Sequence, residues 1–256
     1  WPRGNDGQPL AFTPKDKNKK VRGFIYDMKQ YFEDALNKYC RVAGIDRDQV
    51  KAALTPFLDE SKEFPGYVED PQATGCDTKP KKKKNSPSVG TWDAGVLNRE
   101  AASVIMSLMF GARLARHDLL LAVQALAKLL HQWTAESDRK LYRLMCYIMK
   151  SLCASQVGFI GDPACDLWLG TFGDGDFASD KKSMKSTAGG FVVLMGPNTF
   201  YPLVSLSRNH TSVSHSTTES EMVSMNLVVR EKGIPTLDLW ELILQRKVKM
   251  IVYEDN

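Results

Sequence analysis

The spacing of apolar residues changes once along this chain, near Asp162. Between residues 98 and 152 apolar side chains recur at helical spacing, in three stretches at 101–112, 119–131 and 135–152. After Asp162 they give way to short apolar runs at 167–172, 190–195 and 199–205, which are typical of strands. We therefore predict an α/β (mixed α+β) fold, with a helical region followed by a mixed sheet and flanking helices.

The first 95 residues are less regular. Residues 21–26 predict a short strand, and apolar residues from Met28 to Tyr39 follow at helical spacing. Residues 1–20 are polar and basic, and residues 55–89 have the Pro, Lys, Asp and Ser content of a linker. We divide the chain into a partly disordered N-terminal extension and basic linker (1–95), a helical region (96–160) and a sheet region (161–256).

Polar residues at the expected helix starts predict where the helices begin. Asp118 and Thr134 stand where a side-chain oxygen can accept from the first turn of the second and third helices. Ser216 and Glu219 have the spacing of a capping box. The helix they open is predicted to end at Gly233, and a shorter helix is predicted at 236–246.

The strand signals predict one hairpin and one buried strand. The tight turn at 196–198 joins the runs at 190–195 and 199–205. Residues 248–253 contain four consecutive apolar positions, which favour a central strand buried on both faces. The predicted order is strand, strand, strand, helix, helix, strand.

Composition limits the class of protein. The sequence has 256 residues, 43% of them hydrophobic, and 34 Lys and Arg against 30 Asp and Glu, so it can bury a core and is only mildly basic. No apolar stretch reaches the ~20 residues of a membrane span. The five cysteines are an odd number and lack paired short spacing, which favours a reducing compartment. We expect an intracellular protein, cytoplasmic or nuclear. It begins without methionine and ends on a strand, as expected for a piece of a longer polyprotein or for an artificial boundary.

Basic residues gather in two places. The run at 79–84 reads most simply as a solvated segment, with phosphate contact as the alternative. The second group lies on or near the helices, and either solvation or contact with nucleic acid explains it; its members are Arg113, Arg116, Arg139, Lys140 and Arg143.

Three separated acids are the candidate catalytic and metal-binding residues: Asp174, Glu221 and Asp255. Two-metal hydrolysis of a phosphodiester needs carboxylates that hold two divalent ions, and hard oxygen ligands suit Mg²⁺, with Mn²⁺ as its substitute. Asp176 shares the strand parity of Asp174, and Glu219 and Glu221 are ~200° apart around a helix, so only one of these glutamates faces the sheet. Spacing alone leaves solvated surface carboxylates as the stronger alternative.

Residues from about 98 to 256 resemble the end of a copia-type retrotransposon polyprotein, from the reverse transcriptase connection into the ribonuclease H domain. The resemblance rests on residues 112–119 (ARLARHDL), 173–178 (GDGDFA), 185–189 (KSTAG), 214–223 (SHSTTESEMV) and 254–256 (EDN). These are similar to the family patterns TRPDL or TRPDI, DADWA, RSTSG, SSTEAEYV and CDNQ. A weaker similarity covers residues 21–57.

The resemblance implies a truncated ribonuclease H-like domain that cuts the RNA strand of an RNA–DNA hybrid with two Mg²⁺ ions. It assigns Asp174, Glu221 and Asp255 as the ligands, prefers them to Asp176 and Glu219, and suggests an upstream reverse transcriptase domain as partner.

Lys185, Ser186 and Thr187 match a stretch that we interpret mainly as turn structure and secondarily as a nucleic-acid contact. Gly175 replaces the family's Ala, which we interpret as a mild change. No Tyr-x-Asp-Asp polymerase motif occurs, and the family's fourth acid would lie beyond Asn256. The alternative is a non-catalytic transposon remnant that binds nucleic acid or serves assembly.

Overall fold

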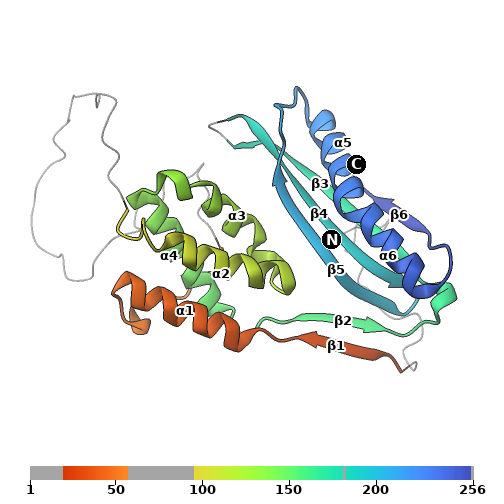
Figure 1. Ribbon diagram of the computed structural model, residues 1–256, viewed down its shortest axis with the longest axis horizontal. Coiled ribbons are helices and arrows are strands. Elements are labelled where there is room, and N and C mark those ends of the chain that lie inside the picture. The colour runs from red at the N-terminus through yellow and green to blue at the C-terminus, as the bar shows by residue number, and fades with distance from the viewer. Residues whose placement is uncertain (1–19, 57–94, 181–182, 255–256) are drawn as a thin grey trace, which may run out of the picture.

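A computed structural model describes residues 20–56, 95–180 and 183–254 of the chain. Within these ranges four helices form one unit and a six-stranded sheet with two further helices forms the other (Figure 1). The helices are α1 (Lys29–Ala43), α2 (Ala101–Leu114), α3 (Leu120–Lys128), α4 (Ala135–Lys150), α5 (Thr217–Val228) and α6 (Ile234–Leu244). The strands are β1 (Arg22–Tyr26), β2 (Gln156–Ile160), β3 (Trp168–Asp180), β4 (Lys185–Gly196), β5 (Thr199–Asn209) and β6 (Met250–Tyr253). The prediction of a mixed α/β fold is confirmed.

The helical unit is built on the apolar stripes that the sequence predicts. Phe32 and Leu36 of α1 pack with Leu108 of α2 and Leu144 of α4, and all four side chains are almost fully buried. Burying such side chains contributes about 1.5–3 kcal/mol each. Helix α1 therefore belongs to this core, although its residues fall in the predicted N-terminal extension. The prediction for residues 1–19 and for the run at 79–84 lies outside the described residues.

A buried arginine joins the helices. Arg116 is 3% exposed, and its guanidinium donates two hydrogen bonds to the Asp118 carboxylate at 2.9 and 2.8 Å. It also donates to the Ser151 carbonyl at 2.9 Å and lies 5.4 Å from the centre of the Phe32 ring. Arg116 is therefore a structural residue, and neither solvation nor nucleic-acid contact explains it. Asp118 is not the predicted N-cap, because its carboxylate is taken up by Arg116 and by the Tyr147 hydroxyl.

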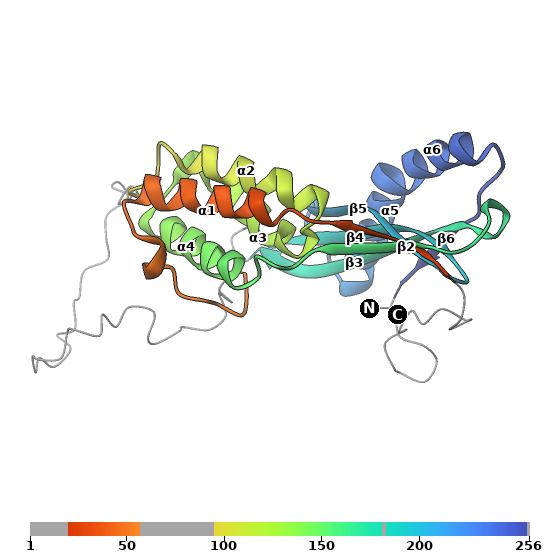
Figure 2. The same ribbon diagram turned by 90° about the horizontal axis from the view of Figure 1, so that it is seen from below.

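Strands β1 and β2 form an antiparallel ribbon that runs between the helical unit and the sheet (Figures 1 and 2). The chain passes from β1 into α1 and from α4 into β2, so both crossings between the units use this ribbon. The sequence predicts β1 but not β2, whose five residues include Gly158, an exposed Val157 and two partly buried apolar side chains. The ribbon and the other four strands form one sheet with the strand order β1-β2-β5-β4-β3-β6.

The hairpin of β4 and β5 forms as predicted, and β3 pairs antiparallel with β4. Strand β6 runs parallel to β3 but lies at the sheet edge and is only partly buried, so the prediction of a central, doubly covered strand is wrong. Within its four-residue apolar run, Met250 packs in the cluster that includes Leu237, Trp240 and Leu244 of α6, whereas Val252 is 44% exposed.

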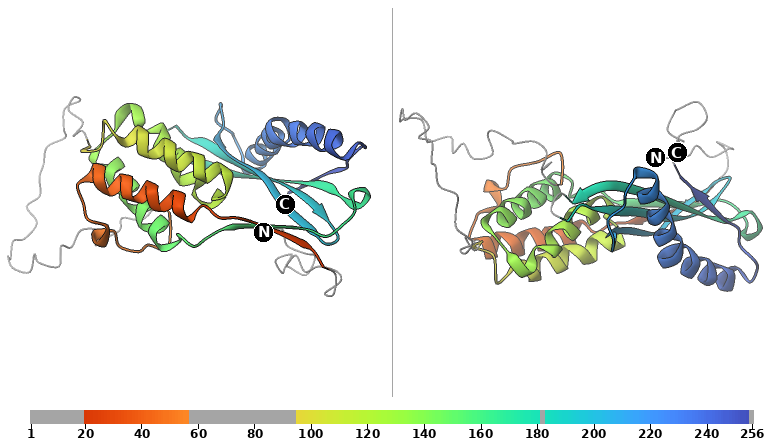
Figure 3. Two further views of the ribbon diagram at one scale, coloured as in Figure 1. Left: turned by 60° about the horizontal axis from the view of Figure 1, so that its bottom comes forward. Right: turned by 90° about the horizontal axis from the view of Figure 1, so that it is seen from above.

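Helices α5 and α6 follow one another without the predicted break at Gly233 (Figure 3). A five-residue π-helical turn, Val229–Gly233, connects them. Gly233 is buried close to Met250, so the glycine allows close packing and does not end the helix. None of the helices in the described ranges is long and apolar enough to cross a bilayer.

Candidate active site

Strand β3 carries two of the candidate acids. We predicted that Asp174 follows the strand, but β3 continues to Asp180 and Asp174 lies within it, opposite Gly189 of β4. Asp176 lies two residues on, opposite Thr187. Both aspartates are exposed, so both carboxylates reach solvent on the same face of the strand.

Helix α5 packs closely on β3 beside these acids. A Cβ atom on Gly175 would lie 2.8 Å from the Ser220 carbonyl oxygen and 2.8 Å from the Ser224 hydroxyl oxygen. Any side chain at position 175 would therefore hold the helix away from the strand, so the interpretation of Gly175 as a mild change from the family's Ala is wrong. Asp174 precedes this contact on the strand, and Glu221 follows it on the helix.

The alternation of the strand decides which side each acid takes. Gly173 and Gly175 face α5, since a Cβ on Gly173 would also contact Met225 of that helix. Asp174 and Asp176 consequently point to the opposite face. Past the last pair with β6, between Phe172 and Tyr253, no described strand covers this edge of β3. The carboxylates of Asp174 and Glu221 can therefore approach each other only around that open edge.

The two glutamates at the start of α5 have different surroundings, as the sequence predicts. Ser216 accepts a hydrogen bond from the Glu219 N–H at 3.1 Å and is the N-cap. The Glu219 carboxylate accepts from the His215 N–H at 2.7 Å, so the reciprocal bond of the predicted capping box reaches one residue further back. The carboxylate of Glu219 is thereby bonded at the helix start, whereas Glu221 is half-buried and lies between Ser220 and Ser224, the two helix residues that contact β3.

The third predicted acid, Asp255, lies outside the described residues. The strand that leads to it is well defined: the Tyr253 ring stacks on the Phe172 ring of β3, with centroids 4.7 Å apart and an interplanar angle of 12°. Strand β6 pairs in parallel with β3 from Leu169–Met250 to Phe172–Tyr253, so the strand that precedes Asp255 lies beside the strand that carries Asp174.

The two aspartates affect each other. Burial raises the pKa of Asp176 above its ordinary value, and the neighbouring negative charge of Asp174 raises it further. A bound cation between or beside them would relieve this repulsion. Oxygen donors of this kind fit Mg²⁺, but within residues 20–56, 95–180 and 183–254 no three His, Cys, Asp or Glu side chains are grouped closely enough to hold a metal ion.

The predicted nucleic-acid contacts have different surroundings. Ser186 is fully buried, and its hydroxyl accepts from the Ala178 N–H at 3.1 Å, where a β-bulge gives Ala178 a φ of 48°. Thr187 is half-buried and donates to Asn209 on β5 at 3.0 Å, and Lys185 is half-buried at the start of β4. The geometry of Ser186 supports the interpretation as turn structure and not as a nucleic-acid contact.

Sequence reasoning missed the residues that set the distance between β3 and α5. Ser220 and Ser224 are fully buried and four positions apart, so they form a strip of small side chains on the helix. Small residues at this spacing, read together with the alternating glycines of β3, were the available signal.

No family model, curated protein or solved structure matches this chain. The interpretation of the site therefore rests on its own geometry and on the motifs in the sequence.

Proposed function

We propose that the chain is a retroelement-derived, ribonuclease H-like module that hydrolyses the RNA strand of RNA–DNA hybrids. The observation that carries the proposal is the contact between Gly175 and Ser220, which brings Asp174 and Glu221 to the two sides of one strand–helix junction. The topology is compatible with the proposal, because three antiparallel strands are followed by helices and a parallel strand, the order predicted from the apolar runs of the sequence.

Asp174, Glu221 and Asp255 are the residues proposed to hold the metal ions. Asp255 enters on sequence position alone: it follows Tyr253 by two residues, as Asp174 follows the paired Phe172 by two. Two Mg²⁺ ions, or Mn²⁺ in their place, supply activation of water and stabilisation of the leaving oxygen when bound. The protein's own contribution is to orient the carboxylates, with α5 held against β3.

The partner is an RNA–DNA hybrid or another nucleic acid, and an upstream reverse transcriptase domain is proposed as a second partner. Specificity would come from hybrid shape and the 2′-hydroxyl groups and not from base sequence. Such a substrate places the protein inside the cell, in the cytoplasm or nucleus. Among the described residues, Cys40, Cys146, Cys153 and Cys165 form no disulfide, which suits a reducing compartment.

Cleavage of a labelled hybrid in Mg²⁺ tests the proposal. We expect the parent chain to shorten the RNA strand, and Asp174→Asn and Glu221→Gln to lose at least about 100-fold in rate, equivalent to about 3 kcal/mol of transition-state stabilisation. Equal cleavage by all three proteins would assign the activity to a contaminant and overturn the proposal.

The second candidate is a non-catalytic remnant that binds nucleic acid. It is favoured by one observation: the described residues bring two of the three predicted ligands to one junction but assemble no group of three acids. Tight, salt-sensitive binding of hybrid without any cleavage by the parent would support this candidate over the enzyme.

A further inference from the structure

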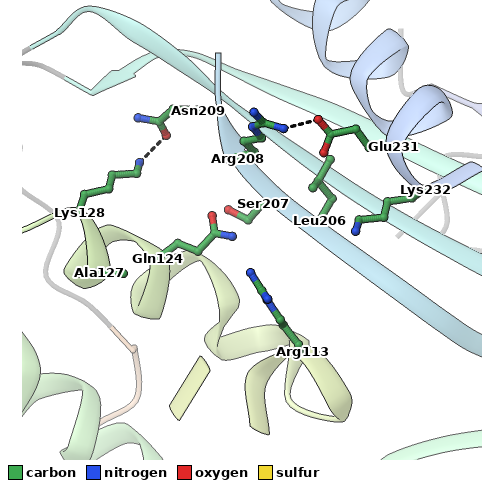
Figure 4. Close-up of a pocket in the computed structure, with 10 residues that line it drawn as sticks. All are labelled: Arg113, Gln124, Ala127, Lys128, Leu206, Ser207, Arg208, Asn209, Glu231 and Lys232. Atoms are coloured by element: carbon green, nitrogen blue, oxygen red, sulfur yellow. Dashed lines mark hydrogen bonds and ion pairs between the residues drawn. The ribbon is translucent and has the colours of Figure 1, made fainter. Parts of the chain in front are cut away.

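A pocket with a volume of about 620 Å³ and several charged residues in its lining lies where the helical unit meets the edge of the sheet (Figure 4). Helices α2 and α3 form one wall, and the end of β5 with the π-helical turn forms the other. The charged residues of its lining are four cations, Arg113, Lys128, Arg208 and Lys232, and one carboxylate, Glu231.

Two of these cations have partners within the pocket. Arg208 forms an ion pair with Glu231, and Lys128 donates to the Asn209 amide oxygen at 2.5 Å. The side chains of Arg113 and Lys232 have no hydrogen bond or ion pair among the described residues, and Figure 4 shows both extending toward the same space. The pocket therefore holds positive charge that the neighbouring part of the protein does not neutralise.

A buried hydroxyl faces this charge. Ser207 of β5 lines the pocket and is 7% exposed, yet its Oγ has no hydrogen-bond partner in the described part of the chain. Burying a hydroxyl without a partner costs about 1–3 kcal/mol, so a ligand that accepts a hydrogen bond from it would offset that cost. A phosphate oxygen beside Arg113 and Lys232 is such an acceptor.

The Ser207 side of the pocket lies on the same face of the sheet as Asp174 and Asp176. Asp174 pairs with Gly189, which pairs with Ser207, so the three residues form a row across β3, β4 and β5. Two strand spacings separate the ends of the row, about 10 Å. Gly189 has no side chain to block the surface between them; even an added Cβ there would meet only the Asp174 carbonyl oxygen, at 3.9 Å.

A second row runs parallel to the first. Asp176 pairs with Thr187, which pairs with Asn209, and Thr187 donates to Asn209 at 3.0 Å. The pocket is thus joined to the acid-bearing segment of β3 by two neighbouring rows of the same rigid sheet.

We propose that this pocket binds backbone phosphates of the nucleic acid whose neighbouring nucleotides lie at Asp174. The inference rests on the proposed function, since it assigns the partner of the same surface. An open groove with unneutralised cations fits a polyanion that enters and leaves along the sheet. Arg113 supplies a planar fork that matches two phosphate oxygens, and Lys232 supplies a point charge.

Salt-dependent binding of a short fluorescein-labelled RNA–DNA hybrid tests the inference. Fluorescence anisotropy is measured on the full chain in buffer without divalent cations, so that no strand is cut. Each phosphate contact contributes about 0.9 to the slope of log affinity against log salt for a duplex. We expect the double variant Arg113→Gln with Lys232→Gln to lose about 1.8 of this slope. Between about 50 and 200 mM salt its affinity should then fall about 12-fold less than that of the parent.

Matched variants separate a specific loss from loss of net charge. Arg41→Gln with Lys150→Gln removes the same charge from exposed positions on α1 and α4, and it should keep the parental slope. Ser207→Ala removes a neutral contact, and it should weaken binding several-fold with an unchanged slope. Arg113→Gln alone, at an exposed position, repeats the test if the double variant melts below the parent.

Equal slopes for the pocket variant and its charge-matched control would overturn the inference, as would failure of the parent to bind hybrid. Cleavage of hybrid by a parent whose slope does not depend on the pocket would leave the proposed function standing without the inference. Pocket-dependent binding by a parent that does not cleave would support the inference while the proposed function fails.

Discussion

Replacing Gly175 by alanine tests the junction on which the site depends. The added Cβ would lie 2.8 Å from the Ser220 carbonyl oxygen, and ordinary contact begins at 3.4 Å, so the helix must withdraw by about 0.6 Å. Overpacking of this kind costs about 1–3 kcal/mol, and loss of glycine flexibility in the unfolded chain returns about 0.4–1 kcal/mol. A net loss of about 1.5 kcal/mol lowers Tm by about 3–6 °C for a protein of this size.

Calorimetry and hybrid cleavage measure the two consequences of Gly175→Ala. Because misplacement by about 1 Å can cost 10²-fold in rate, we expect cleavage to fall by about 10–100-fold. Gly23→Ala on β1 is the matched control, since a Cβ there meets no atom of the described residues within 4 Å. It should leave cleavage unchanged and raise Tm by about 1–4 °C, through the same loss of flexibility in the unfolded chain. If Gly175→Ala melts and cleaves as Gly23→Ala does, the contact does not position the site.

Three further predictions follow from the same structure. Asp176→Asn should retain cleavage within about tenfold of the parent, and a loss above about 100-fold would show that Asp176 is itself a ligand. Burial lowers the pKa of His117 and of His210 in the folded chain. In the unfolded chain these histidines have the ordinary pKa of about 6.5, so the unfolded chain binds more protons than the folded chain as the pH falls to 6.5 and below. Stability should therefore be independent of these groups above about pH 7.5 and fall as the pH drops through 6.5, as followed by urea unfolding. Arg116→Ala should lower the free energy of unfolding in urea by about 2–3 kcal/mol. This is less than the roughly 3–5 kcal/mol lost when a fully buried pair is broken, because the partner carboxylate of Asp118 is 39% exposed. A loss below about 0.5 kcal/mol would contradict the structural role of Arg116.

The spacing of apolar residues was enough to predict the helices and strands that depend mainly on residues nearby in the sequence. Helix α4 is an example: Thr134 caps it by accepting from the Ser137 N–H at 3.3 Å, as the sequence indicates, and its apolar stripe is buried. The β4–β5 hairpin is another, since its turn and its two strands are contiguous in the chain.

The features that the sequence could not predict depend on distant neighbours. The apolar run of β6 is compatible with a central or an edge strand, and only the absence of a second described neighbour decides for the edge. Asp118 has the side chain of an N-cap, but Arg116 competes for its carboxylate more effectively than the helix does. Glycine is common at helix ends, but Gly233 packs closely against Met250 and lies within a continuous run of helical residues.

The candidate site was predictable in part. Motif order selected Asp174 and Glu221, and the structure places them beside one contact of strand and helix. The residues that create the contact, Ser220 and Ser224, carry no chemistry of their own and become visible only when the helix is packed on the strand.

The central claim is that Asp174 and Glu221 serve one hydrolytic site, and a double-mutant cycle in the hybrid cleavage rate tests it most directly. Groups that act as a unit are strongly non-additive, so we expect Asp174→Asn with Glu221→Gln to be no slower than the slower single variant. Losses that multiply in the double variant, or rates unchanged from the parent in both single variants, would contradict the account.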